Sequence, residues 1–115
     1  MRLLIALLCL LTAPAFAGGT QYFSALPDLP LAPNLAEEAD SAVRFDQPEG
    51  RIIILQATGK AQAPEINGFY YKTLPALGWK QADANRFTRE HESLTFDIKP
   101  LANGQNRLNV MVKPQ

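Results

Sequence analysis

Apolar and polar residues alternate along residues 94–99 and again along residues 108–113. A period of two is typical of half-buried β-strands, because successive side chains of a strand point to opposite faces of the sheet. Pro100 ends the first stretch, and Asn103-Gly104 forms the centre of a predicted turn between the two. The end of the chain therefore predicts two strands joined by a turn.

The hydrophobic period changes to that of a helix between residues 64 and 77. One stripe repeats at helical spacing and consists of Ile66, Phe69, Tyr70, Thr73, Leu74 and Leu77. Pro64 suits the first turn of a helix. Pro75 interrupts the hydrogen-bond ladder, so we expect the regular helix to end close to Leu74 with one further irregular turn. Gly78 predicts a left-handed stop.

Four more strands are predicted around this helix. Residues 43–46 and 51–58 flank a Gln-Pro-Glu-Gly turn and predict a hairpin. The unbroken apolar run over residues 52–55 predicts that the second strand is central and at least partly covered on both faces. Residues 79–82 and 86–90 predict two further strands. The expected fold of residues 43–115 is α+β, in the order β-β-α-β-β-β-β. One helix packs on a face of an antiparallel sheet of about five to six short strands.

Residues 18–42 predict a Pro-rich extended arm before this domain. Pro27, Pro30 and Pro33 recur every three residues, a spacing that favours polyproline II. The leucines among them leave two interpretations, a PxxP-type ligand for a partner or an apolar strap over the domain's own core. We favour the strap, because SH3-like modules that recognise PxxP segments occur chiefly in the cytosol.

Residues 1–17 have the order of a cleavable secretory signal peptide. Arg2 precedes an apolar run over residues 3–11, and an A-x-A pattern ending at Ala17 predicts cleavage between Ala17 and Gly18. The run is shorter than the roughly 20 residues that span a bilayer. We therefore expect a protein of the bacterial periplasm or the exterior.

Cys9, the single cysteine of the chain, lies inside this predicted signal. Cleavage would leave a protein with no disulfide, no thiol chemistry and no thiolate metal site. Leu7 and Leu8 stand where a lipoprotein would need a small residue, so we expect no stable membrane anchor. The chain has 11 basic and 11 acidic residues and no basic run. This balance excludes the phosphate-neutralising patch of nucleic-acid binding and a polybasic membrane patch.

Catalytic motifs are missing from the sequence. His91, the single histidine, stands between Glu90 and Glu92 in a predicted hairpin turn, where it lacks the pocket and the partner that acid–base chemistry needs. Neither G-x-S-x-G nor a phosphate-binding glycine loop occurs. We expect no enzyme activity, no catalytic residue, no metal and no cofactor.

Two aromatic residues are candidates for a contact surface. Tyr71 lies on the flank of the predicted helix, where it could be exposed. Trp79 is expected to pack under the helix end, because large aromatic side chains dominate small cores. The alternative is that Tyr71 and Trp79 form a patch for a partner or ligand.

The run from Phe69 to Trp79, with residues 46–52 before it and residues 87–90 and 94–96 after it, resembles a group of small exported proteins and lipoproteins of proteobacteria. These proteins carry an FYxxxLPxLGW-like core. The resemblance covers roughly residues 43–112 and implies an exported protein and a fold, but no activity. The missing lipobox cysteine departs from the lipoprotein members.

The expected function is that of an exported, non-enzymatic accessory or binding protein that acts on another envelope protein. One alternative is a small-ligand carrier or enzyme with a cleft between the helix and the N-terminal strap, lined by converging polar groups. A further alternative is an exported inhibitor or immunity-type protein.

Overall fold

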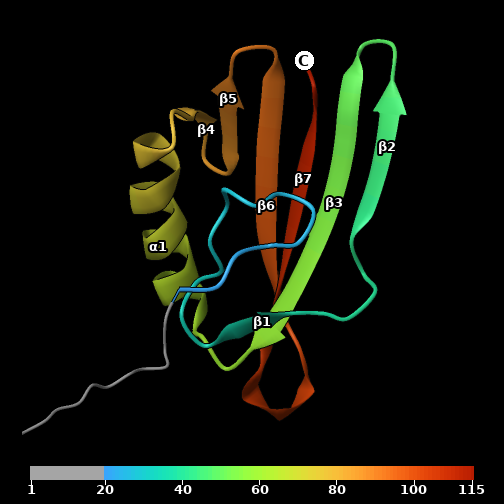
Figure 1. Ribbon diagram of the computed structural model, residues 1–115. Helices are drawn as coiled ribbons and strands as arrows, with labels where there is room; N and C mark the ends of the chain where they lie inside the picture. The colour runs from blue at the N-terminus through green and yellow to red at the C-terminus, as the bar shows by residue number, and fades with distance from the viewer. Residues whose placement is uncertain (1–19) are drawn as a thin grey trace, which may run out of the picture.

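The helix and strands follow the hydrophobic pattern of the sequence, with one strand more than the predicted order contains. The computed structural model describes residues 20–115. One helix packs on a seven-stranded antiparallel sheet, an α+β fold (Figure 1). The elements are β1 (Leu35–Glu37), β2 (Val43–Gln47), β3 (Gly50–Gly59), α1 (Ala63–Ala76), β4 (Lys80–Asp83), β5 (Arg86–Arg89), β6 (Glu92–Pro100), the 3-10 turn η1 (Ala102–Gly104) and β7 (Asn106–Pro114).

The sheet is built from hairpins. Its strand order is β1-β3-β7-β6-β5-β4. β2 also pairs with β3, along the same edge as β1 but at the other end of β3. The predicted hairpin of β2 and β3 is confirmed, with Gln47 opposite Gly50. The Asn-Gly turn between β6 and β7 is confirmed as well. Asn103 and Gly104 have φ angles of 66° and 72°, a conformation that these two residue types adopt most readily.

α1 extends two residues past its predicted end at Leu74 and stops at Ala76. Pro75 costs the ladder the bond of its own missing N–H, and since it lies in the last turn, only Ala76 follows it in the helix. Gly78 then ends the helix with a φ of 93°. Its N–H donates to the Pro75 oxygen at 3.0 Å, and the N–H of Trp79 donates to the Leu74 oxygen at 3.0 Å. This pair of bonds is a Schellman motif, so the predicted left-handed stop is confirmed.

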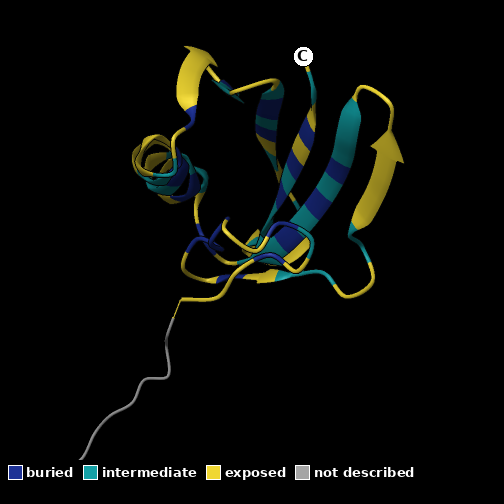
Figure 2. Cartoon of the chain, turned by 45° about the horizontal axis from the view of Figure 1, so that its top comes forward, coloured by how far each residue is buried: buried dark blue, intermediate teal, exposed yellow. Residues whose placement is uncertain are grey.

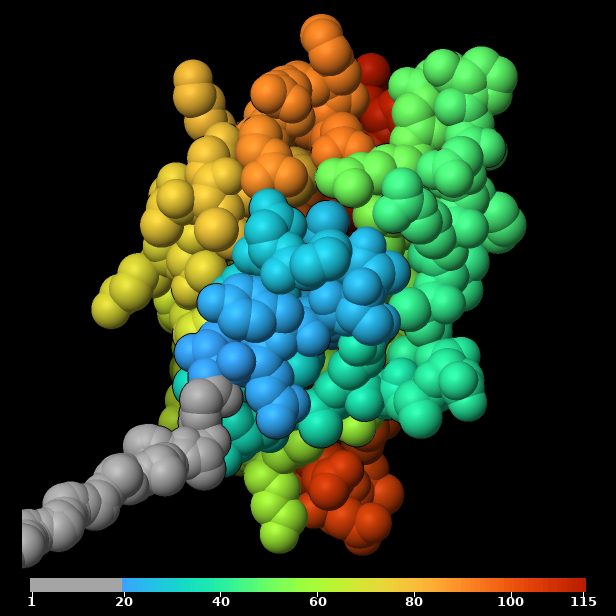
Figure 3. All heavy atoms as spheres, in the orientation of Figure 1, coloured from blue at the N-terminus to red at the C-terminus, as the bar shows by residue number. Residues whose placement is uncertain are grey.

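Residues 20–34, called the strap below, lie over the sheet beside α1 (Figure 3). The strap does not run extended as polyproline II. It folds back on itself, because the N–H of Phe23 donates to the Leu29 oxygen at 3.0 Å and the N–H of Leu31 donates to the Gln21 oxygen at 2.7 Å. This loop turns its apolar side chains inward. The buried ones are Phe23, Leu26, Leu29, Leu31 and Ala32. The interpretation as a strap over the domain's own core is confirmed.

β1 is the strand that the sequence did not predict. Leu35 lies opposite Gly59 of β3, and a Cβ at Gly59 would overlap the carbonyl oxygen of Asn34. Gly59 therefore allows the chain to approach β3 closely enough to pair. A three-residue strand inside a Pro-rich segment has no local signal, since it forms through this distant contact.

The sheet has an inner face, which carries α1 and the strap, and an outer face on the opposite side. Burial alternates along the two central strands, β3 and β7 (Figure 2). Ile53, Leu55 and Ala57 of β3 are fully buried on the inner face. The predicted signal peptide over residues 1–17 and its cleavage site at Ala17 and Gly18 lie outside the described residues.

Candidate binding surfaces

The outer face of the sheet carries an apolar stripe across three strands. We call it the outer stripe; it consists of Val43, Phe45, Ile52, Ile54 and Met111. Phe45 lies opposite Ile52, Val43 opposite Ile54, and Ile54 opposite Met111. Cross-strand partners point to the same face of a sheet, so these side chains are neighbours.

The outer stripe is open to solvent. Phe45 is 54% exposed, Met111 38% and Val43 37%, and they are three of the five exposed large hydrophobic residues in the described part of the chain. The stripe explains the unbroken run Ile52–Leu55. β3 has an apolar inner face and a second, partly exposed apolar face, because no layer formed by residues 20–115 covers it from outside.

Basic residues lie on the outer face, beside the outer stripe and farther along the strands. Lys113 follows Met111 by two positions and therefore points to the same face, and Lys99 lies on this face opposite Arg107. Both lysines are exposed. Arg107 is held by Glu38 at 2.7 Å, and the exposed Asp97 adds one carboxylate. Lys113 therefore borders the outer stripe, whereas Lys99 and Arg107 lie two residue pairs farther along this face, beyond Asn109 and Asp97.

β2 forms a free edge of the sheet next to the outer stripe. All five of its residues are exposed, and its ladder runs to β3. Val43 and Phe45 belong to the outer stripe. Arg44 and Asp46 point to the inner side, where they form an ion pair of 3.5 Å.

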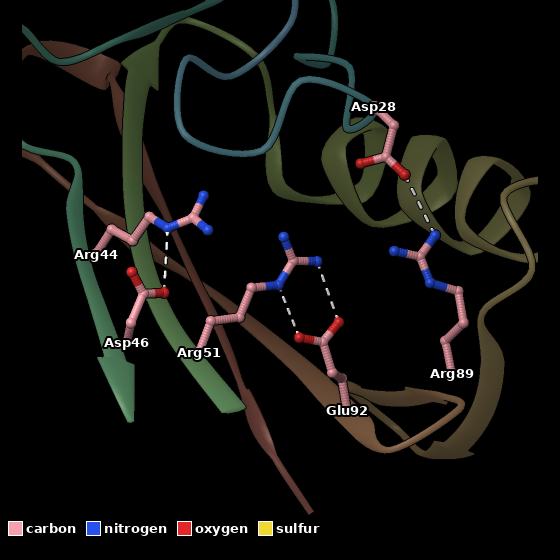
Figure 4. A network of polar contacts seen from close by, with 6 residues as sticks. All are labelled: Asp28, Arg44, Asp46, Arg51, Arg89 and Glu92. Atoms are coloured by element: carbon pink, nitrogen blue, oxygen red, sulfur yellow. Dashed lines mark hydrogen bonds and ion pairs between the residues drawn. The ribbon is translucent and has the colours of Figure 1, made fainter. Parts of the chain in front are cut away.

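Three ion pairs lie at the end of the inner face that α1 and the strap leave open (Figure 4). Arg51 of β3 reaches Glu92 of β6 through two bonds of 2.7 and 3.1 Å. The hydrogen bond to Glu92 is the main cause that raises the pKa of Arg51 above its ordinary value. Arg51 and Glu92 are both mostly covered, so this bidentate pair fastens β3 to β6 across β7.

Arg89 of β5 fastens the strap and the helix end. Its Nη1 donates to Asp28 at 3.2 Å and to the Leu77 oxygen at 3.0 Å. The guanidinium lies 4.3 Å from the centre of the Trp79 ring, within the range of a cation–π contact. Arg44, Arg51 and Arg89 thus each face a carboxylate, and the two pairs of Arg51 and Arg89 connect separate elements of the fold.

A groove lies between α1 and the strap, at the place where the alternative of a small-ligand carrier requires a cleft. Its volume is about 260 Å³, and its lining is Ala32, Pro33, Asn34, Pro64, Glu65, Gly68, Phe69 and Lys72. The helix interior holds a glycine here, and a Cβ on Gly68 would meet no atom within 4 Å. The groove exists partly because this position lacks a side chain.

The structure does not bring Tyr71 and Trp79 together as a surface patch. Trp79 is 2% exposed and lies in the core, whereas Tyr71 is 37% exposed. The Tyr71 hydroxyl donates to the Ala84 oxygen at 2.6 Å, so the ring serves to hold the β4–β5 turn. His91 lies in the exposed turn between β5 and β6, as predicted.

The outer stripe was missed at the sequence level, although a signal for it exists. Val43 and Phe45 alternate with charged residues, and Met111 stands at a polar position of the alternation in residues 108–113. Together with the apolar run over residues 52–55, they place apolar side chains on the second face of three strands. The pairing of those strands was needed to bring them together.

Within residues 20–115, no group of three or more His, Cys, Asp or Glu side chains is arranged to hold a metal ion. No helix in this range has the length and apolar character to cross a membrane. Comparison of the chain with protein-family models, curated proteins and solved structures finds no match.

Proposed function

We propose that this chain is an exported, non-enzymatic binding protein that acts on another envelope protein through the outer stripe. The observation that carries the proposal is the exposed apolar face of the sheet, opposite the helix. Contiguous exposed apolar surface is uncommon on monomeric soluble proteins and marks interaction sites. The signal-like residues 1–17, and the resemblance to small exported proteobacterial proteins, support export.

The border of the stripe indicates the chemistry of the partner. Lys113 flanks the apolar side chains and Lys99 lies farther along the same face, so the complementary surface is apolar at its centre and carries carboxylates at its rim. Charge complementarity of this kind steers association and sets the register of an interface. Binding should weaken with salt, because rim charges are screened.

The groove beside α1 gives weaker support to a small-ligand carrier. Its volume of about 260 Å³ lies below the roughly 300–1,000 Å³ of typical ligand pockets. Its charged residues, Glu65 and Lys72, both belong to α1. Glu65 already accepts the N–H of Gln62 at 2.9 Å.

Photo-cross-linking in cells tests the proposed function. A benzoylphenylalanine placed at Phe45 lies in the outer stripe, and the same residue at Tyr22, which is 52% exposed in the strap, is a matched control. We expect an adduct with a second protein from position 45 and none from position 22. Met111→Lys should abolish that adduct. Adducts with this chain alone, or equal adducts from both positions, would contradict the proposal.

A further inference from the structure

The three edges of the sheet differ in how they are protected. β4 carries Lys80 and a register shift between Gln81 and Asp83, and β1 is three residues long. Charged residues, irregular pairing and short strands are the usual devices that prevent edge-to-edge association. β2 pairs with β3 over Val43–Gln47 without a break and has no proline. Its two charged residues, Arg44 and Asp46, have opposite signs, so they do not repel a second copy that pairs antiparallel. It is the least protected of these edges.

We propose that two copies of this chain associate through β2, antiparallel about a two-fold axis at Phe45, into one continuous sheet. This inference goes beyond the proposed function, because it concerns the edge of the sheet and not its outer face. The backbone N–H and C=O groups on the free side of β2 supply the hydrogen bonds of the new ladder. A two-fold axis makes this interface self-complementary.

The side chains of β2 select this register. With the axis at Phe45, Arg44 of each copy lies opposite Asp46 of the other, and the two Phe45 rings meet on the outer face. Both charged residues are at least half exposed, with side-chain exposures of 50% and 77%, so they can exchange their internal partner for one on the second copy. Opposite charges across a strand pair are stabilising.

The two neighbouring antiparallel registers and the parallel register fail on charge. An axis at Arg44 would place two Arg44 side chains opposite each other, and an axis at Asp46 would place two carboxylates together. Parallel pairing in register would place each residue of β2 next to the same residue of the second copy, so Arg44 would meet Arg44 and Asp46 would meet Asp46. Directly opposed like charges are destabilising in a sheet. In the favoured register, Val43 and Phe45 of both copies join, so the two outer stripes become one continuous apolar surface.

Charge reversal tests the interface, with sedimentation velocity of purified residues 18–115 over a range of concentrations as the readout. We expect wild type to form a dimer. Arg44→Asp makes both positions acidic and Asp46→Arg makes both basic, so each single variant should dimerise at least tenfold more weakly. The double variant Arg44→Asp/Asp46→Arg restores opposite charges and should dimerise again. A mixture of the two single variants should form a heterodimer.

Controls separate this interface from misfolding and from the outer face. Arg86→Asp disrupts a comparable exposed pair, Arg86–Asp83 at 3.0 Å, and should leave dimerisation unchanged. A wild-type chain that stays monomeric up to millimolar concentration would overturn the proposal. Dimerisation lost with Met111→Lys but retained with Arg44→Asp would overturn it too, since it would place the contact on the face. The measurement contains no other protein, so its failure leaves the proposed function standing.

Discussion

Tyr70 is the residue that ties the helix to the strap. It is 2% exposed, and its ring lies 4.9 Å from Phe69 and 5.7 Å from Phe96, measured between ring centroids. Its hydroxyl donates to the Pro30 oxygen at 2.8 Å and accepts the N–H of Ala32 at 3.1 Å. One buried hydroxyl thus satisfies two backbone groups of the strap, which would otherwise be unpaired away from water.

Tyr70→Phe should lower the free energy of unfolding by about 1–3 kcal/mol, because it leaves the Ala32 N–H and the Pro30 carbonyl without a partner. Urea unfolding followed by Trp79 fluorescence measures this loss. Tyr22→Phe, on an exposed ring, is the control and should change stability by less than about 0.5 kcal/mol. Equal effects of the two substitutions would contradict the role of the Tyr70 hydroxyl.

The Tyr70 hydroxyl also makes the free energy of unfolding depend on pH in the alkaline range. Burial raises the pKa of Tyr70 well above its usual value of 10.0, and the hydrogen bond from Ala32 opposes this shift in part. The unfolded chain loses the proton near pH 10 while the folded chain keeps it, so folded stability decreases as pH rises above about 10. The difference in stability between wild type and Tyr70→Phe should therefore shrink between pH 9 and pH 11.

At the scale of elements, both ends of α1 are capped by hydrogen bonds, whereas its middle contains a residue of low helix propensity. The side chains of Gln62 and Glu65 form a capping box at its start, and the Schellman motif closes its end. Between them stands Gly68, which costs a helix about 0.5–1 kcal/mol relative to alanine. No neighbouring atom requires a glycine at this position.

Gly68→Ala should raise the free energy of unfolding by about 0.5–1 kcal/mol, because it removes backbone freedom from the unfolded chain and adds a Cβ in open space. The matched control is Gly59→Ala. Its Cβ would collide with the backbone of Asn34, so it should cost about 1–3 kcal/mol or more. Urea unfolding measures both, and a stabilising Gly59→Ala would contradict the close approach of β1 to β3.

How far the sequence predicts these elements depends on where their cause lies. The stripe from Ile66 to Leu77 and the turns at Pro48 and Asn103 are local signals, and the helix and hairpins followed from them. β1 depends on Gly59, about twenty residues away in sequence, so no local pattern contains it. The outer stripe has the same origin: Phe45, Ile54 and Met111 become neighbours only through the pairing of three strands.

At the scale of the whole molecule, the core is shared by the sheet, the helix and the strap. α1 contributes Ile66, Tyr70 and Leu74 as its buried side chains. The strap contributes about as much, with Phe23, Leu26 and Leu29 each 2% exposed or less. The predicted boundary at Val43, between an N-terminal arm and a folded domain, therefore cuts through one shared hydrophobic core.

The chain of residues 43–115 alone should fail to fold, whereas residues 20–115 should fold cooperatively. Each large apolar side chain that the strap buries contributes about 1.5–3 kcal/mol, and several of them together match the roughly 5–15 kcal/mol that stabilises a domain of this size. Without the strap, the Tyr70 hydroxyl also loses both of its buried hydrogen-bond partners.

The emission of Trp79, the single tryptophan of the chain, reports the outcome, because the ring is buried only when the core is formed. Residues 43–115 should show the emission of a solvent-exposed indole and no cooperative transition in urea. A synthetic peptide of residues 20–42 should restore both signals when it is added in excess, because its apolar side chains can refill the core in trans. The same peptide with Phe23→Ser and Leu29→Ser is the control and should restore neither. A cooperative transition of residues 43–115 on their own would show instead that the strap covers a core that is already complete.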